Sequence, residues 1–174
     1  SPYSAYSTFA GNPYMIDLDL LAEEGLLDPA DYQNLNWGDD PEKVDFGLLY
    51  DNRFKVLKKA ADRFLANPAA DYEDFLKENA DWLNDYALFM ALKDANNGDS
   101  WQEWPAEMKE YSSEKAAKLA EEYKDSIDGC KALHYVFLKQ WKNVRAYANE
   151  NGIEIIGDLP IYAALYSVDA WSSP

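Results

Sequence analysis

The segment Gly152-Ile-Glu-Ile-Ile-Gly-Asp-Leu-Pro-Ile-Tyr162 carries the clearest β-strand signal in this chain. Ile153, Ile155 and Ile156 form a short β-branched run between two glycines, which is typical of a strand covered on both faces in a parallel sheet. A long helical pattern precedes the run, and Asp158 follows it. Acidic residues at the carboxyl end of such strands often face a ligand. Asp158 could equally cap a neighbouring helix, and the sequence leaves these two roles open.

The composition excludes several classes of function. The chain has 174 residues, a formal charge of -16 and a pI near 4.3, which argues against nucleic acid or an anionic membrane surface as a partner. No segment has the apolar length of a membrane span. The single cysteine, Cys130, excludes an internal disulfide and agrees with a reducing cytoplasm. The single histidine, His134, excludes a multi-histidine metal site, and no cofactor or metal is expected.

Helical patterns dominate between residues 17 and 151. A chain of this total length is expected to form a single domain. Asp17 is predicted to cap a helix over 18–24 that ends at Gly25. Asp28-Pro29 and Asp40-Pro41 each combine an N-cap with a proline at the first helical position. Apolar residues at helical spacing predict further helices over 44–65, 71–95, 113–123 and 127–150.

Residues 1–16 show neither helical nor strand periodicity, and Gly11-Asn12-Pro13 indicates a turn. The aromatic residues Tyr3, Tyr6, Phe9 and Tyr14 predict an ordered loop, because such rings need a surface on which to pack. The chain begins without a methionine and without an element that would support this loop. We therefore expect it to be an internal piece of a longer protein.

The aromatic content has two interpretations. The 13 Tyr, 7 Phe and 6 Trp residues are expected mainly to fill a helical core, and Trp101 and Trp104 to pack under a helix connection. A few rings could instead line a groove for a flat, hydroxyl-rich ligand such as a sugar. Composition does not choose between them.

Catalytic motifs are absent from the sequence: there is no phosphate-binding glycine loop, G-x-S-x-G, H-E-x-x-H or C-x-x-C. His134 and Cys130 lie beside apolar helical positions, so both are expected to be buried structural residues. Asp158 remains the main ligand-facing candidate because Pro160 ends the predicted strand beside it. Asp169, next to Trp171, is a weaker candidate.

Five ordered segments resemble the 4-alpha-glucanotransferases (amylomaltases or disproportionating enzymes) of glycoside hydrolase family 77. They are Ser1–Leu18 (S-P-Y…F-A-G-N-P…I-D-L), Trp82–Leu92 (W-L-x-D-Y-A-L-F-x-A-L), Trp101–Pro105 (W-x-x-W-P), Gln140–Asn149 (Q-W…Y-A-N) and Gly152–Tyr162 (G-I-x-I-I-G-D-x-P-I-Y). One segment departs from the family pattern, since Tyr166 stands where a family acid is usual. Around it, Val168 and Ala170 differ, whereas Ser167, Asp169 and Trp171 match.

The resemblance implies part of a (β/α)8 TIM barrel enzyme. Residues 1–16 would form the substrate-side loop after the second barrel strand. Residues 17–151 would form a helical insertion and the helix before the next strand, and residues 152–174 that strand and its following loop, all within a single structural unit. The fold class expected for the chain itself is mostly α-helical with one or two short β-strands.

The resemblance also implies an activity. Family members move α-1,4-glucan segments between maltooligosaccharides by a retaining mechanism with an aspartate nucleophile and a glutamate acid/base. These catalytic carboxylates would lie beyond Pro174, so no catalytic residue is expected in this chain. What carries over is sugar contact: Asp158, and Tyr3 with Ser1 beside it, match substrate-binding positions.

Two other interpretations remain open, a stand-alone carbohydrate-binding module and a non-catalytic acidic helical interaction domain. For the isolated chain we also expect self-association, because an apolar strand without neighbours invites pairing with another copy.

Overall fold

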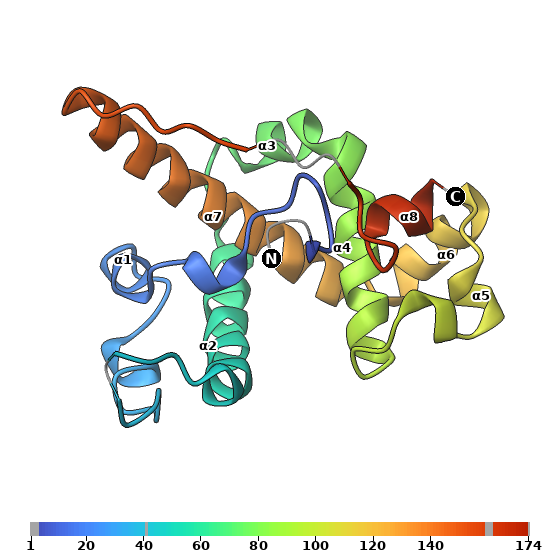
Figure 1. Cartoon of the computed structure of the whole chain (residues 1–174), viewed down its shortest axis with the longest axis horizontal. Coiled ribbons are helices and arrows are strands. Elements are labelled where there is room, and N and C mark those ends of the chain that lie inside the picture. The colour runs from blue at the N-terminus through green and yellow to red at the C-terminus, as the bar shows by residue number, and fades with distance from the viewer. Residues whose placement is uncertain (1–3, 41, 159–161, 174) are drawn as a thin grey trace.

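The computed structural model describes residues 4–40, 42–158 and 162–173, and helices account for its architecture (Figure 1). The α-helices are α1 Leu18–Glu23, α2 Phe46–Ala66, α3 Tyr72–Glu78, α4 Ala80–Ala95, α5 Ala106–Lys109, α6 Ser113–Glu122, α7 Lys124–Glu150 and α8 Val168–Ser172. Short 3-10 helices lie at η2 Pro13–Met15, η3 Pro29–Asp31 and η4 Trp101–Glu103. None of these described helices is long and apolar enough to cross a bilayer.

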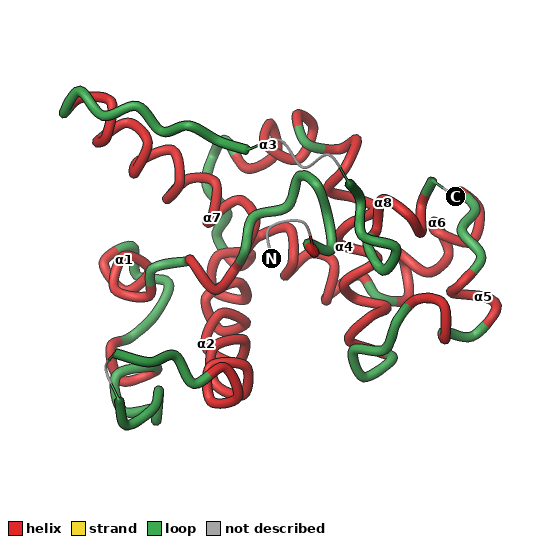
Figure 2. The backbone as a smooth tube through the Cα atoms, in the orientation of Figure 1, coloured by secondary structure: helices red, strands yellow, loops and turns green. Residues whose placement is uncertain are grey.

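The prediction of one or two short β-strands is wrong: the described residues contain no strand (Figure 2). After α7 the chain continues through residues 153–158 as an irregular segment in which Ile153, Ile155 and Ile156 are 59%, 42% and 91% exposed. A strand exists only through hydrogen bonds to a neighbouring strand. A β-branched run indicates a preference for burial in a sheet, but it cannot supply the partner.

Helix starts follow the predicted capping chemistry, with one displacement. The Asp17 carboxylate accepts hydrogen bonds from the backbone N–H groups of Asp19 and Leu20, and Gly25 follows α1 with a φ of +75°. The next long helix, α2, is capped by Asp45, whose Oδ1 accepts from Leu48 N at 3.0 Å. The Asp40-Pro41 signal therefore lies several residues before the helix that it was expected to start, and Pro41 itself lies outside the described residues.

The predicted helix over 71–95 is interrupted at Asn79, which separates α3 from α4. The Asn79 side chain donates to Phe75 O at 2.8 Å and accepts from Trp82 Nε1 at 3.1 Å. Asparagine side chains compete in this way with the helical backbone hydrogen bonds. Both helices pack on α7, so the interruption turns the chain while keeping each apolar face covered.

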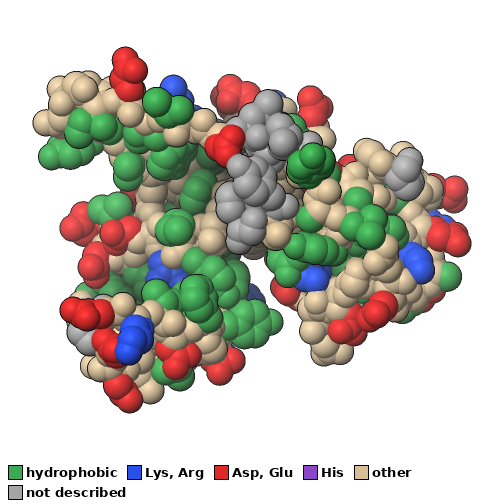
Figure 3. All heavy atoms as spheres, in the orientation of Figure 1, with side chains coloured by type: hydrophobic (Ala, Val, Ile, Leu, Met, Phe, Trp, Pro, Cys, Tyr) green, Lys and Arg blue, Asp and Glu red, His purple; other side chains and the backbone are tan. Residues whose placement is uncertain are grey.

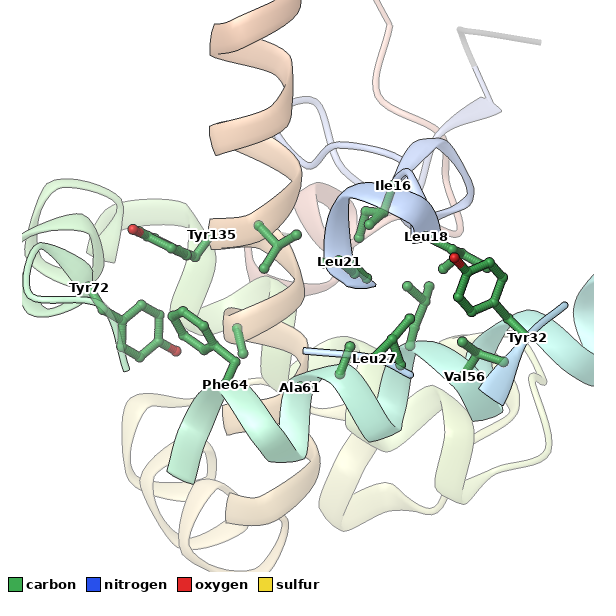
Figure 4. Packing of buried hydrophobic residues seen from close by; sticks show 14 residues of the cluster. Ile16, Leu18, Leu21, Leu27, Tyr32, Val56, Ala61, Phe64, Tyr72 and Tyr135 are labelled. Carbon is green, nitrogen blue, oxygen red and sulfur yellow. The ribbon is translucent and has the colours of Figure 1, made fainter. Parts of the chain in front are cut away.

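The helices bury two hydrophobic clusters, and α7 contributes to both. Figure 4 shows the first cluster, in which α1, α2 and α3 pack against α7. Its aromatic end joins Phe64, Tyr72 and Tyr135, with the Phe64 and Tyr135 ring centroids 5.1 Å apart. Its other end holds Ile16, Leu18, Leu21, Leu27, Tyr32 and Val56.

The second cluster packs α4, α6 and α8 around the Trp104 and Trp171 rings. Phe89 of α4 lies between them, with centroids 5.3 Å from Trp104 and 5.7 Å from Trp171. Ile127 and Cys130 join this cluster from α7. The helix α7 thus connects both clusters, and its C-terminal half extends away from the other helices (Figure 1).

Candidate functional site

The predicted substrate residues fall at the edges of the described structure. Ser1 and Tyr3 lie outside the described residues. Asp158 is exposed at the end of the irregular segment after α7. What the structure describes in detail is the framework that follows each of them, namely the N-terminal loop, residues 4–16, and the C-terminal segment, residues 162–173.

These two parts of the chain are joined directly through Thr8 and Asp169. The Asp169 carboxylate accepts a hydrogen bond from Thr8 N at Oδ2 and another from Thr8 Oγ1 at Oδ1, both at 3.1 Å. Beside them, Val168 N donates to Tyr6 O at 2.8 Å. The sequence marked Asp169 only as a weak ligand candidate and gave no role to Thr8. No local signal could have paired two residues that are 161 positions apart.

Asp169 is presented by a firmly anchored helix. Trp171, one turn of α8 away from Ser167, is 2% exposed, and its Nε1 donates to Met108 O at 3.0 Å. Ser167 is fully buried, and its Oγ accepts from Ala170 N at 3.4 Å as the N-cap of α8. Packing of Trp171 in the second cluster therefore determines where the Asp169 carboxylate lies.

The N-terminal loop is held from within as well as by α8. Buried Ser7 accepts from Phe9 N at 3.1 Å and from Ala10 N at 3.2 Å through its Oγ. Phe9 stacks on Trp82 with ring centroids 6.2 Å apart. A Cβ atom at Gly11 would lie 2.0 Å from Cε1 of Phe137. Only glycine allows the backbone to approach that ring so closely.

The end of the loop is attached to α7 by Gln140. Its side-chain oxygen accepts from Asp17 N at 2.7 Å, and its amide nitrogen donates to Asp17 O at 3.1 Å. Arg53 of α2 adds a hydrogen bond to Ile16 O. Partial burial lowers the pKa of the Arg53 guanidinium, with Asp17 acting in the opposite direction. From the sequence, Gln140 is recognised only within a segment that resembles the family, and the sequence does not reveal this pairing with the backbone.

Three side chains gather beside the contact between Thr8 and Asp169, which we call the clamp. Lys93 Nζ lies 4.8 Å from the centre of the Tyr6 ring, and it donates to Gly98 O at 2.6 Å and Asp99 O at 3.2 Å. Burial lowers the pKa of Lys93. Tyr166, at the position that departs from the family pattern, meets the Tyr6 ring edge-on with centroids 6.1 Å apart. An aromatic contact thus occupies this position.

His134 is a buried structural residue, as predicted, whereas Cys130 is only partly buried. His134 is 1% exposed, and its Nδ1 lies 2.9 Å from Cys130 O, one turn earlier in α7. Its ring meets Tyr86 at a centroid distance of 4.9 Å, and burial lowers its pKa. The described residues also contain no cluster of three or more side chains suited to holding a metal. Trp104, expected to pack under a helix connection, is 4% exposed in the second cluster.

Comparisons with known proteins agree with this framework. A family model described as 4-alpha-glucanotransferase matches residues 1–174. The chain is 45% identical over 174 residues to the 4-alpha-glucanotransferase of Clostridium butyricum and 40% identical over 185 residues to that of Thermus thermophilus. The whole chain aligns with each, but it covers only 36% and 35% of their respective lengths.

A solved structure shares the arrangement of the chain. The amylomaltase from Streptococcus agalactiae in complex with acarbose matches with a TM-score of 0.93 and 40% identity, over 100% of this chain and 36% of that one. The chain thus spans about a third of the length of these relatives. Since the family model matches every residue, the chain belongs to the 4-alpha-glucanotransferase family.

Proposed function

We propose that this chain forms the donor-side part of a 4-alpha-glucanotransferase that moves α-1,4-glucan segments between maltooligosaccharides. The observation that carries this proposal is the match along the whole chain to the structure of an amylomaltase in complex with acarbose. In the proposal, Asp158 accepts hydrogen bonds from sugar hydroxyls, because a carboxylate gives strong, oriented contacts to them. Tyr3 supplies an apolar face for a sugar ring, and Ser1 lies beside it.

The proposed reaction is a retaining double displacement. An aspartate attacks the anomeric carbon while a glutamic acid protonates the leaving sugar, which gives a covalent glycosyl-enzyme. The 4-hydroxyl of an acceptor then attacks the anomeric carbon, the glutamate takes the proton of that hydroxyl, and the bond to the aspartate breaks. We assign both carboxylates to polypeptide outside these residues. In this scheme Asp158, Tyr3 and Ser1 of the chain hold substrate, and the chain carries out no bond-breaking step.

Incubation with maltotriose tests the proposal. We expect the full-length protein to form glucose and longer maltooligosaccharides, and the 174-residue chain alone to form neither. Product from the chain alone would overturn the assignment of the catalytic carboxylates elsewhere. Absence of product from the full-length protein would overturn the transferase itself.

Asp158 can be tested separately in the full-length protein. Asp158→Asn keeps the size of the side chain but removes the charge, so we expect donor binding to weaken and kcat/KM for maltotriose to fall by about a hundredfold, equivalent to the loss of about 3 kcal/mol from charge-assisted hydrogen bonds. Glu154→Gln, an exposed change earlier in the same segment, is the matched control. An equal loss in both variants would indicate damage to the segment instead of loss of a sugar contact.

The alternative of a stand-alone carbohydrate-binding module makes a different prediction. Such a module would bind maltoheptaose saturably as the isolated chain and lose that binding in Asp158→Ala. We expect no saturable signal, because the contacts from one wall of a binding site contribute less free energy than is lost when a flexible sugar is ordered. A non-catalytic interaction domain would give neither binding nor activity at any length of the protein.

We also propose that the protein is cytoplasmic, because its single cysteine agrees with a compartment in which thiols stay reduced. We also propose that the isolated chain associates with itself at high concentration, because Ile153, Ile155 and Ile156 are exposed. Burial of such apolar surface favours association. Sedimentation that stays monomeric at millimolar concentration would contradict this.

A further inference from the structure

We propose that Asp169 is a positioning residue, which holds Thr8 and thereby fixes the N-terminal loop, residues 4–16, against α8. The inference rests on the proposed function, in which Tyr3 and Asp158 contact the glucan. Asp169 itself touches no substrate in this scheme. It acts through the N-terminal loop.

The geometry fixes both the place and the orientation of Thr8. One carboxylate oxygen accepts from the backbone N–H and the other from the side-chain hydroxyl of the same residue, each at 3.1 Å. A bidentate contact of this kind restricts rotation as well as distance, and the charge on the acceptor strengthens both bonds. The adjacent bond from Val168 N to Tyr6 O, at 2.8 Å, continues the junction along the backbone.

The two sides of the contact between Thr8 and Asp169 differ in rigidity. This difference decides which of the two residues positions the other. On the α8 side, Trp171 and Ser167 are buried and hydrogen-bonded within the second cluster. On the other side, Thr8 is exposed in an irregular loop. A buried helix next to an exposed loop acts as the fixed reference, so Asp169 positions Thr8 and not the reverse.

Both candidate substrate residues lie close to this junction along the chain. Tyr3 precedes Thr8 by five residues, and Asp158 precedes Asp169 by eleven. The loop between Thr8 and α1 has its own attachments, at Gly11 against Phe137 and at Asp17 on Gln140. Before Ser7, Tyr6 O accepts from Val168 N, and the Tyr6 ring contacts Tyr166 as well as Phe89 and Lys93 of α4. Loss of the Asp169 contact would therefore act on the loop at Thr8, next to these contacts of Tyr6.

Steady-state kinetics of the full-length protein with maltotriose test the role. We expect Asp169→Ala to raise KM about tenfold while kcat changes less than twofold, as for removal of charge-assisted hydrogen bonds that align the donor. Thr8→Val keeps the bond from the backbone N–H and should raise KM less. The double variant should be little worse than Asp169→Ala alone, because Asp169→Ala already removes both bonds. Asp169→Glu, which keeps the carboxylate, should recover most of the KM.

Hydrogen–deuterium exchange in the same proteins supplies a readout independent of activity. We expect faster exchange in the peptide containing Thr8 for Asp169→Ala, and no change for Glu121→Gln, an exposed carboxylate on α6. Unchanged exchange would show that the contact is absent in solution. Faster exchange with unchanged KM would limit Asp169 to a structural role, and either result overturns the inference. If the wild-type protein shows no transferase activity while exchange responds as expected, the proposed function fails but the clamp itself stands.

Discussion

The two halves of α7 carry similar apolar residues in different surroundings. In the first half Ile127, Tyr135 and Val136 are 6%, 7% and 5% exposed, and the two hydrophobic clusters cover them. In the second half Trp141, Val144 and Tyr147 are 41%, 56% and 71% exposed. Figure 3 shows hydrophobic side chains at the surface of this projecting part. Helical spacing therefore predicts which side of a helix is apolar, but it does not predict how far its covering extends.

The largest expected difference in stability is between two variants that each replace a tyrosine of α7 by alanine, one in each half of the helix. Tyr135→Ala should lower the free energy of unfolding of the chain by about 3–5 kcal/mol, as for other buried aromatic truncations. The ring contacts Phe64, Tyr72 and Phe75, and its hydroxyl donates to Asp71 at 2.6 Å. Tyr147→Ala should cost less than about 0.5 kcal/mol. Urea denaturation measures both values, and equal losses would remove the distinction between the halves.

An intermediate effect is expected where the N-terminal loop meets the covered half. Gly11→Ala brings a methyl group against the Phe137 ring, and we expect a loss of about 2 kcal/mol because one or the other must move. Gly129→Ala, in the same helix with nothing within 4 Å of its Cβ, is the matched control. It should stabilise the chain by about 0.5–1 kcal/mol through helix propensity. Thermal unfolding that moves in the same direction for both variants would contradict this explanation.

The smallest effect is a pH dependence that arises in the covered half. Burial lowers the pKa of His134 below its ordinary value of 6.5, so the unfolded chain takes up a proton at a higher pH than the folded chain. The stability contributed by neutral His134 is then complete above about pH 6.5 and is lost as the pH falls towards the folded-state pKa.

A comparison with His134→Gln separates the pH dependence of stability that arises from His134 from the pH dependence that arises from the many carboxylates of the chain. We expect the difference in unfolding free energy between wild type and variant to narrow by about 1 kcal/mol between pH 7.5 and pH 5, because one pH unit of unequal proton binding is worth about 1.4 kcal/mol. Denaturation curves over that range measure it. A constant difference would mean that His134 titrates alike in both states.

Much of the helical architecture could be predicted from local chemistry. The predictions of the Asp17 cap and of Gly25 are confirmed, because the cap needs only residues two and three positions away, Asp19 and Leu20. The helix over 44–65 was placed within two residues of α2. The break at Asn79 is not predicted because α3 and α4 share one apolar pattern, and the hydrogen bonds of the Asn79 side chain and the packing of both helices on α7 appear only in the folded chain.

The predicted strand and the site required information that is not local. A strand pattern is present at Ile153, Ile155 and Ile156. A strand forms only by hydrogen bonding to a neighbouring strand, and the described residues contain no such strand. Similarly, the sequence singled out Asp158 for its position, whereas Thr8 and Asp169 acquire their relation only when α8 docks through Trp171. The spacing of residues in the sequence does not predict hydrogen bonds across such a separation, because these bonds form only when the chain folds.

The lone thiol of the chain gives the covered half of α7 a chemical reporter. Cys130 is partly buried against the second cluster, and this burial raises the pKa of its thiol to about 12. Alkylating reagents react with the thiolate, so the folded chain should label very slowly near neutral pH. Any opening that separates α7 from α4 would restore an ordinary acidity and expose the sulfur. Because there is one cysteine, the labelling rate would time that opening without an introduced probe.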